Sequence, residues 1–233
     1  MIDKRIHYYL VLDTETANGL DDALVYDIGG AVVDKRGNIY STFSFTIRDI
    51  FVFEREMMQT AYYADKIPSY VREHHEGTRK MVDFYTARKY VLNLMKEYNI
   101  KDVAAYNAHF DRAALNTTQR WLTKSKYRYF FPRDTQFICI WNMACQTLCQ
   151  RKTYKEFCEK NNLISNRGNN YSTSAENVYR YLILNPSYKE EHKGIDDVAI
   201  EAYIFARCFA AKKKFYNGKG IKRNCWMQVK REV

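Results

Sequence analysis

The chain has 233 residues, 46% hydrophobic and 27% charged, so it is long enough to bury the core of one domain or of two small ones. Its 15% aromatic content, with only 3 Pro and 9 Gly, excludes disordered, collagen-like and low-complexity proteins. The 37 Lys and Arg against 27 Asp and Glu give a net charge of +10, which favours a polyanionic partner, nucleic acid before a membrane surface.

The first part of the chain predicts strands. Tyr8–Leu12 is an apolar run that stops at the polar Asp13, as is typical of a central strand buried on both faces. Residues 27–33 and 38–47 are two further strand-like runs, and the turn residues Lys35–Asn38 lie between them. We therefore expect an antiparallel meander over the first 47 residues.

Helices and strands alternate in the rest of the chain. After an irregular stretch, the spacing of apolar residues predicts an amphipathic helix over 86–98, and a short strand follows at 103–106. Further helices are predicted over 111–124, 136–150, 154–162, 175–184 and 196–212. A meander followed by interleaved helices and strands predicts an α/β fold with a mixed sheet.

No segment of the sequence predicts export or a membrane span. The run Tyr8–Leu12 is too short for a signal peptide or a transmembrane helix, so we expect a cytoplasmic protein without membrane contact. The six cysteines contain no C-x-x-C pair, which indicates reduced thiols rather than a disulfide scaffold. Cys145 and Cys149 lie one helical turn apart, and we interpret them as core thiols rather than zinc ligands.

Positive charge is concentrated in two segments. Residues 112–133 hold six basic residues and no acidic one, and residues 212–233 hold eight basic residues against Glu232. Aromatic residues are interleaved with the charges of the second segment, a pattern found at nucleic-acid surfaces, although a solvated tail has the same charge. We expect a domain over 1–211 and a basic C-terminal extension over 212–233 that contacts nucleic acid or a protein partner.

Two acidic motifs follow predicted strands. Asp13 and Glu15 end the first strand, where the two-residue period of a strand places both carboxylates on one face. Two close carboxylates require a divalent cation or basic groups between them. Asp111 ends the motif Asn107-Ala-His-Phe-Asp111 between the fourth strand and a helix, where helix capping is the alternative role.

The third motif, His192-Lys-Gly-Ile-Asp-Asp197, directly precedes the last predicted helix, and its acids are also candidates for a helix cap. In this order the three motifs resemble those of the DEDDh branch of the DnaQ-like 3′-5′ exonucleases. This superfamily includes the proofreading epsilon subunit of bacterial DNA polymerase III, RNase T and oligoribonuclease. The resemblance extends from about Tyr8 to Cys208, and residues 175–186 are similar to versions encoded by Firmicutes and their phages.

The resemblance implies a ribonuclease H-like α/β fold, in which a mixed five-stranded sheet is flanked by helices. It also implies a mechanism with two Mg²⁺ or Mn²⁺ ions, which clamp the attacking and leaving oxygens of a phosphodiester. His192 is then the general base, a role that suits an unperturbed histidine with a pKa of about 6.5. The metal-binding acids implied by the resemblance are Asp13, Glu15, Asp111 and Asp197.

Residues next to these acids are expected to contact the substrate. They are Thr14, Asn107 and Phe110, although an aromatic residue at a junction of strand and helix is also typical of a core. Two positions depart from the family. Lys193 stands where Thr or Gly is more familiar, and Val198 stands where Ala is more familiar. We expect this departure to affect substrate contacts more than chemistry.

The implied activity is removal of nucleoside 5′-monophosphates from a free 3′ end, with single-stranded DNA favoured as the substrate. An exoribonuclease similar to RNase T is the first alternative, because hydrolysis with two metal ions neither requires nor forbids a 2′-hydroxyl. A second alternative is a non-catalytic nucleic-acid-binding protein of the same fold. Such a protein would be expected to lack some of the acids, whereas this chain has all four and the histidine. A third is a proofreading or processing subunit that needs a polymerase partner.

Overall fold

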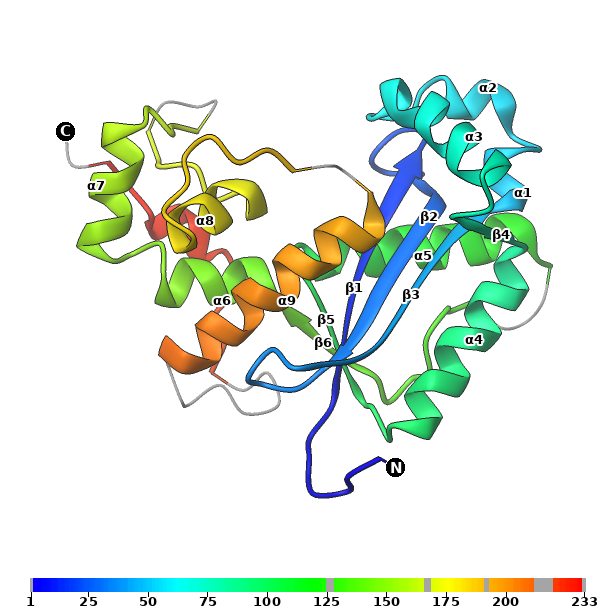
Figure 1. Cartoon of the computed structure of the whole chain (residues 1–233), viewed down its shortest axis with the longest axis horizontal. Coiled ribbons are helices and arrows are strands. Elements are labelled where there is room, and N and C mark those ends of the chain that lie inside the picture. Colours follow the sequence, from blue (N-terminus) through cyan, green and yellow to red (C-terminus); the bar gives the residue numbers. More distant parts are fainter. Residues whose placement is uncertain (1, 125–127, 166–168, 191–192, 212–219, 232–233) are drawn as a thin grey trace.

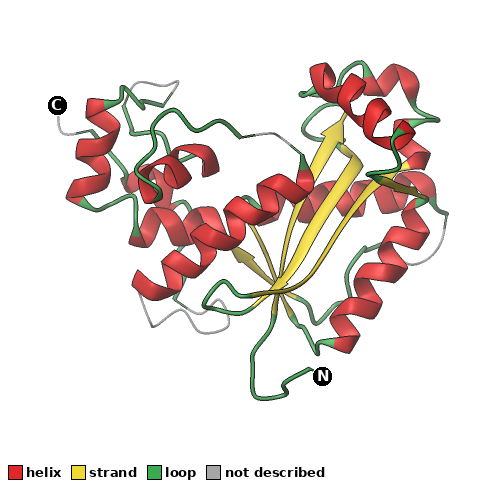
Figure 2. Cartoon of the chain, viewed as in Figure 1, coloured by secondary structure: helices red, strands yellow, loops and turns green. Residues whose placement is uncertain are grey.

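The computed structural model of the chain describes residues 2–124, 128–165, 169–190, 193–211 and 220–231. Within these residues, a six-stranded sheet has the order β4-β3-β2-β1-β5-β6 and is flanked by helices (Figures 1 and 2). The strands are β1 Tyr9–Ala17, β2 Leu24–Val33, β3 Ile39–Ile47, β4 Lys80–Val82, β5 Asp102–Ala105 and β6 Gln136–Cys139. β1 to β3 form an antiparallel meander, whereas the other three strands join by parallel pairing. The predicted mixed α/β fold is confirmed, with one strand more than the five expected.

Two hydrophobic cores lie on opposite faces of the sheet. The first core packs the sheet against α3, α4 and α5, and the second packs it against α6, α7, α8 and α9. The α-helices within the described residues are α1 Arg48–Phe51, α2 Arg55–Met58, α3 Ile67–His75, α4 Phe84–Glu97, α5 Ala108–Leu122, α6 Ile140–Thr147, α7 Lys152–Lys160, α8 Ala175–Leu182 and α9 Gly194–Ala211. Two short 3₁₀ helices complete this set, η1 Ala64–Lys66 and η2 Cys225–Gln228.

β1 continues past the predicted end of the strand and includes the first acidic motif. Its side chains alternate between the two cores, so Leu12 lies in the first core and Tyr9 and Val11 lie in the second. Asp13 and Glu15 follow Tyr9 and Val11 on the same face, which is the face that α9 covers. The strand period therefore directs both acids toward α9.

The prediction of one helix over 136–150 is wrong at its beginning. Residues 136–139 form β6, which pairs in parallel with β5 and buries Ile138, and α6 begins only at Ile140. A short apolar run has the same pattern in a strand as in a buried helix. The open edge of β5 decides between the two, because a strand there satisfies its backbone groups.

The stretch between β3 and α4 is regular, contrary to expectation. It holds α1, α2, η1, α3 and β4, and each of the helices has three to nine residues. No side-chain cap begins any of these helices, so the usual sequence signal is missing. α3 carries Tyr70 into the first core, which shows that tertiary packing stabilises the segment.

The described end of the chain, residues 220–231, packs against α6. The Cys225 backbone N–H donates to Asn142 Oδ1 at 3.2 Å, and Gln146 Nε2 donates to the Gly220 carbonyl at 3.0 Å. Cys145 and Cys149 are buried in the second core, as predicted. None of the helices in the described part of the chain is both long and apolar enough to cross a membrane.

Candidate metal centre

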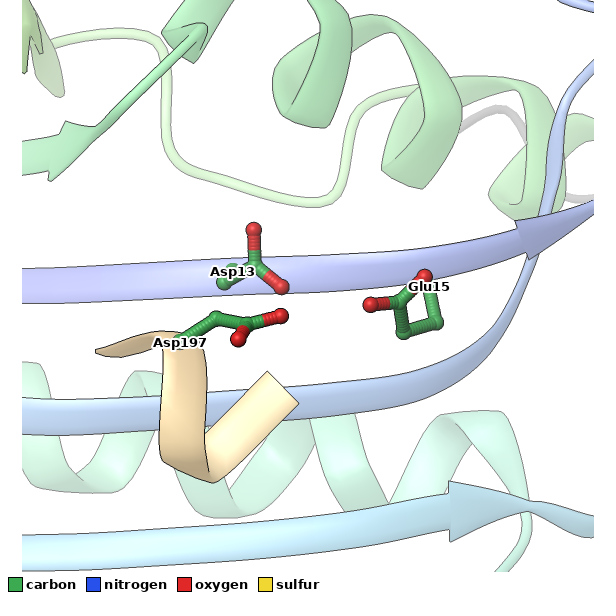
Figure 3. A group of neighbouring side chains, drawn as sticks. All are labelled: Asp13, Glu15 and Asp197. Atoms are coloured by element: carbon green, nitrogen blue, oxygen red, sulfur yellow. The ribbon is translucent and has the colours of Figure 1, made fainter. Parts of the chain in front are cut away.

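Three acids from two distant parts of the chain meet beside the centre of the sheet. Asp13 and Glu15 come from β1 and Asp197 from the first turn of α9, and one carboxylate oxygen of each lies within 4.8 Å of the others (Figure 3). Glu15 and Asp197 are buried, whereas Asp13 is partly exposed. The donors are all hard oxygens, which suit Mg²⁺ or Mn²⁺ better than a soft metal.

Asp111 belongs to the same group of charges, because its carboxylate raises the pKa of Asp13. It is buried in the first turn of α5, and the neighbouring Thr14 Oγ1 donates to its Oδ1 at 2.9 Å. α5 already begins at Ala108, so Asp111 is not the cap of this helix. Asp197 likewise lies inside α9, which begins at Gly194. The capping alternative therefore fails for both acids.

Glu201 is a fifth acid at this centre, and the sequence-based prediction missed it. It lies one helical turn after Asp197, is 2% exposed, and its Oε2 has no hydrogen-bond partner among the described residues. Its position in the sequence could have indicated it. Glu201 follows Asp197 by four residues and so lies on the same face of α9, where Ile200 and Ile204 are also buried. An ionisable side chain is rarely placed there without a counter-charge.

Burial raises the pKa of Asp13, Glu15, Asp111 and Glu201, and repulsion between neighbouring carboxylates adds to the shift for Asp13, Glu15 and Glu201. For Asp13, burial comes first and the charges of Glu201 and Asp111 follow. Burial and the charge of Asp197 raise the pKa of Glu15 to about 9. Burial raises the pKa of Asp111 to about 7, although the hydrogen bond from Thr14 opposes the shift. A bound divalent cation would offset this repulsion, so the acids fit a metal centre.

A buried network fastens the beginning of α9 to β2. Asp27, which is fully buried, accepts hydrogen bonds from Arg79 at 2.9 Å, from Tyr70 Oη at 2.7 Å and from the Gly194 backbone N–H at 3.2 Å. Gly29 is required at this crossing, because a Cβ there would lie 2.2 Å from the carbonyl carbon of Gly194. The network therefore sets the position of Asp197, three residues into the helix.

The same network reaches α3 through Glu73. Arg79 Nε donates to Glu73 Oε2 at 2.7 Å, and the ammonium of Lys193 donates to Glu73 Oε1. Lys193 stands where the resembled family more often has Thr or Gly. In this chain Lys193 therefore forms an ion pair that connects the third motif to α3.

The other predicted site residues lie around this centre. Asn107 is exposed at the N-cap of α5, and Phe110 is partly buried and packs against the first core. Thr14 is buried and bonded to Asp111, so its side chain orients an acid. Their contacts with a substrate stay predictions. His192, the expected general base, lies outside the described residues.

We expect Glu201→Gln to raise the melting temperature of the metal-free protein, because it keeps the shape of the side chain and removes a charge that repels Asp13. A gain on the order of 1 kcal/mol corresponds to about 2–4 °C for a domain of this size. Thermal melting in a chelator measures it. When folding raises the pKa of a carboxyl group, the free energy of unfolding of the protein falls as pH rises above about 4, because only the unfolded chain then releases the proton freely. The gain is therefore larger at pH 8 than at pH 5.

The matched control for this prediction is Glu156→Gln. The Glu156 side chain is 60% exposed on α7, so its charge is screened and the substitution should leave the melting temperature unchanged. A lower melting temperature for Glu201→Gln in chelator would contradict the repulsion described above.

Comparisons with known proteins show the fold. No family model matches the sequence. A search of curated proteins also finds no match. The crystal structure of E. coli exonuclease I with a dA16 oligonucleotide has a TM-score of 0.56 at 11% identity, covering 91% of this chain and 42% of that chain. The zinc-bound complex of E. coli exonuclease I with single-stranded DNA has a TM-score of 0.53 at 11% identity, covering 90% and 42%.

This chain thus spans less than half the length of these structural neighbours. Neither of them is the epsilon subunit, and that specific resemblance stays a prediction of the motifs. The match covers about nine tenths of the chain. The chain therefore has a fold that is found within E. coli exonuclease I.

Proposed function

We propose that this chain is a metal-dependent 3′-5′ exonuclease that releases nucleoside 5′-monophosphates, with single-stranded DNA as its favoured substrate. The observation that carries the proposal is the convergence of Asp13, Glu15 and Asp197 within 4.8 Å, with Asp111 near enough for its charge to raise the pKa of Asp13. The shared fold supports it, because the two neighbours reported above are exonuclease I structures described as complexes with single-stranded DNA or a DNA oligonucleotide.

The acids have the chemistry to hold two Mg²⁺ or Mn²⁺ ions. We assign Asp13 to both ions, Glu15 and Asp197 to one of them, and Asp111 to the other. When bound, such ions stabilise negative charge on the phosphodiester oxygens and lower the pKa of a bound water. The raised pKa values of the acids show that ionising them together in the folded protein is unfavourable without a cation.

The side chains of the protein orient the acids and move the proton. Thr14 holds Asp111 through its hydrogen bond, and the Asp27 network holds the first turn of α9. We assign the general base to His192 from the sequence motif, and Gly194, two residues later, is fastened to Asp27. A histidine changes charge near neutral pH, so it can accept the proton of the attacking water at physiological pH.

The experiment that tests the proposal is hydrolysis of 5′-labelled single-stranded DNA and RNA oligomers in Mg²⁺, in Mn²⁺ and in chelator. We expect a ladder that shortens from the 3′ end with either metal, release of nucleoside 5′-monophosphates, and no reaction in chelator. An oligomer with a 3′-phosphate is the control for the requirement for a free 3′ end. Intact oligomers under every condition would overturn the proposal.

The same experiment separates the alternatives. Faster shortening of RNA than of DNA would identify an exoribonuclease. Binding without hydrolysis would identify a nucleic-acid-binding protein or a subunit that needs a polymerase partner. A polymerase partner and a cytoplasmic location stay predictions from the sequence.

A further inference from the structure

The two basic segments of the sequence meet on one side of the molecule. Arg112, from the beginning of α5, and Lys222 and Arg223, from the C-terminal segment 220–231, line one open pocket with a volume of about 730 Å³. More than 100 residues separate Arg112 from Lys222 in the chain. The packing of segment 220–231 against α6 brings them together.

The charge of this pocket is of one sign. Among the described residues that line it, none is acidic, and all three basic side chains belong to exposed residues. A second pocket of about 460 Å³ shares Arg112 and Phe137 with the first and adds Arg133. It also has no acidic side chain among its described lining residues. The two pockets together form a basic strip along α5 and β6, of the kind that attracts phosphates.

Aromatic rings accompany the charges. The indole rings of Trp141 and Trp226 both line the first pocket, with centroids 6.0 Å apart and planes within 9° of parallel. Trp141 is held in place, because its Nε1 donates to Thr173 Oγ1 at 2.9 Å. The Arg112 guanidinium lies 4.8 Å from the centroid of the Phe137 ring. Nucleic-acid bases stack on such rings whatever their sequence, because every base has a π-face.

The pocket also adjoins the second acidic motif. Asn107 and His109 line it, and Asp111 lies two residues after His109 in the first turn of the same helix. We infer that this pocket binds the nucleotides that precede the 3′ end of a single strand, with phosphates at Arg112, Lys222 and Arg223 and a base on Trp226. Only the placement of the 3′ end at the acids rests on the proposed function, since binding to the pocket needs no hydrolysis.

The test measures the affinity of the full chain for fluorescent dT12 by anisotropy, in chelator, over a series of salt concentrations. We expect Lys222→Ala/Arg223→Ala to weaken binding about tenfold and to lower the slope of log K against log salt by about 0.7 for each phosphate that the variant no longer neutralises. Trp226→Ala should weaken binding about 5- to 150-fold, as for the loss of one stacked base. Circular dichroism checks that each variant is folded.

Two matched controls separate the pocket from general effects. Trp121→Ala removes an exposed tryptophan at the far end of α5, where its Nε1 donates to Glu54. Lys152→Ala/Lys155→Ala removes the same charge from α7. Both should leave the affinity for dT12 unchanged. Equal affinity of wild type and both pocket variants, or an equal loss in the lysine control, would overturn the inference.

This measurement is independent of catalysis. If the wild type fails to shorten any oligomer but the pocket variants lose affinity for dT12, the proposed exonuclease is wrong and the binding pocket stands. If the wild type shortens DNA and the pocket variants bind dT12 as tightly as it does, the exonuclease stands and the pocket is wrong. A C-terminal segment that serves a protein partner instead would give this second result.

Discussion

Asp13→Asn is expected to lower exonuclease turnover by about 10³-fold and to leave the fold intact. The charges of Glu15, Asp197 and Asp111 all act on Asp13, so we assign it to both ions. Asparagine keeps the size of the side chain and removes the negative charge. A loss of about 4 kcal/mol of transition-state stabilisation corresponds to this factor.

The same substitution is expected to stabilise the protein in chelator. Burial and the charges of Glu201 and Asp111 raise the pKa of Asp13, so ionising it in the folded state is unfavourable. A neutral side chain removes that cost. The prediction thus combines a large loss of activity with a higher melting temperature, a pair of results that misfolding could not produce.

Initial rates on 5′-labelled DNA and thermal melting in chelator measure the two effects. The control is Asp21→Asn, which removes a carboxylate from an exposed position in the loop after β1 and should change neither. Turnover of Asp13→Asn within tenfold of the wild type would contradict the assignment of Asp13 to the metal centre.

Arg79→Ala is expected to destabilise the protein by about 3–5 kcal/mol, because it leaves Asp27 buried without its charged partner. The side chain of Arg79 is itself only 5% exposed, and it forms ion pairs with both Asp27 and Glu73. Asp27 also holds the Gly194 backbone, so the position of Asp197 depends on this ion pair. We therefore expect turnover to fall as well, by a smaller factor than in Asp13→Asn.

Urea denaturation in chelator measures the free energy of unfolding. The control is Arg5→Ala, since Arg5 makes a 2.8 Å ion pair with Asp3 at the surface with its side chain 90% exposed. Water and salt screen such exposed pairs, so this variant should unfold at the same urea concentration as the wild type. A loss below about 1 kcal/mol for Arg79→Ala would show that the buried pair does not hold the start of α9.

A second variant keeps the positioning role testable if Arg79→Ala is too unstable to purify. Asp27→Asn/Arg79→Met removes both charges and keeps similar volumes, so much of the stability should return. Turnover should stay below wild type, because the hydrogen bond from Gly194 to a carboxylate is lost. Wild-type turnover in the double variant would contradict a positioning role for this network.

Patterns local to the chain were sufficient for the meander, for most of the helices and for the shared face of Asp13 and Glu15. The strand period alone places these two carboxylates together, and the apolar spacing alone identifies α4. The first residue of a helix depends on its cap. The side chain of Asp83 accepts a hydrogen bond from the Thr86 backbone N–H, so α4 begins two residues before the predicted start.

Contacts between distant parts of the chain decided the rest. β6 is a strand because β5 offers it a parallel neighbour, and the charge of Glu201 acts on Asp13 because α9 crosses the face of β1 that carries Asp13. The meeting of Arg112 with Lys222 and Arg223 depends on how segment 220–231 packs against α6. The sequence by itself determined which acids and which basic segments the protein has, because side-chain chemistry and short-range periodicity are local. Only the tertiary structure decided which of them lie together, because long-range packing sets that proximity and leaves no periodic signal in the chain.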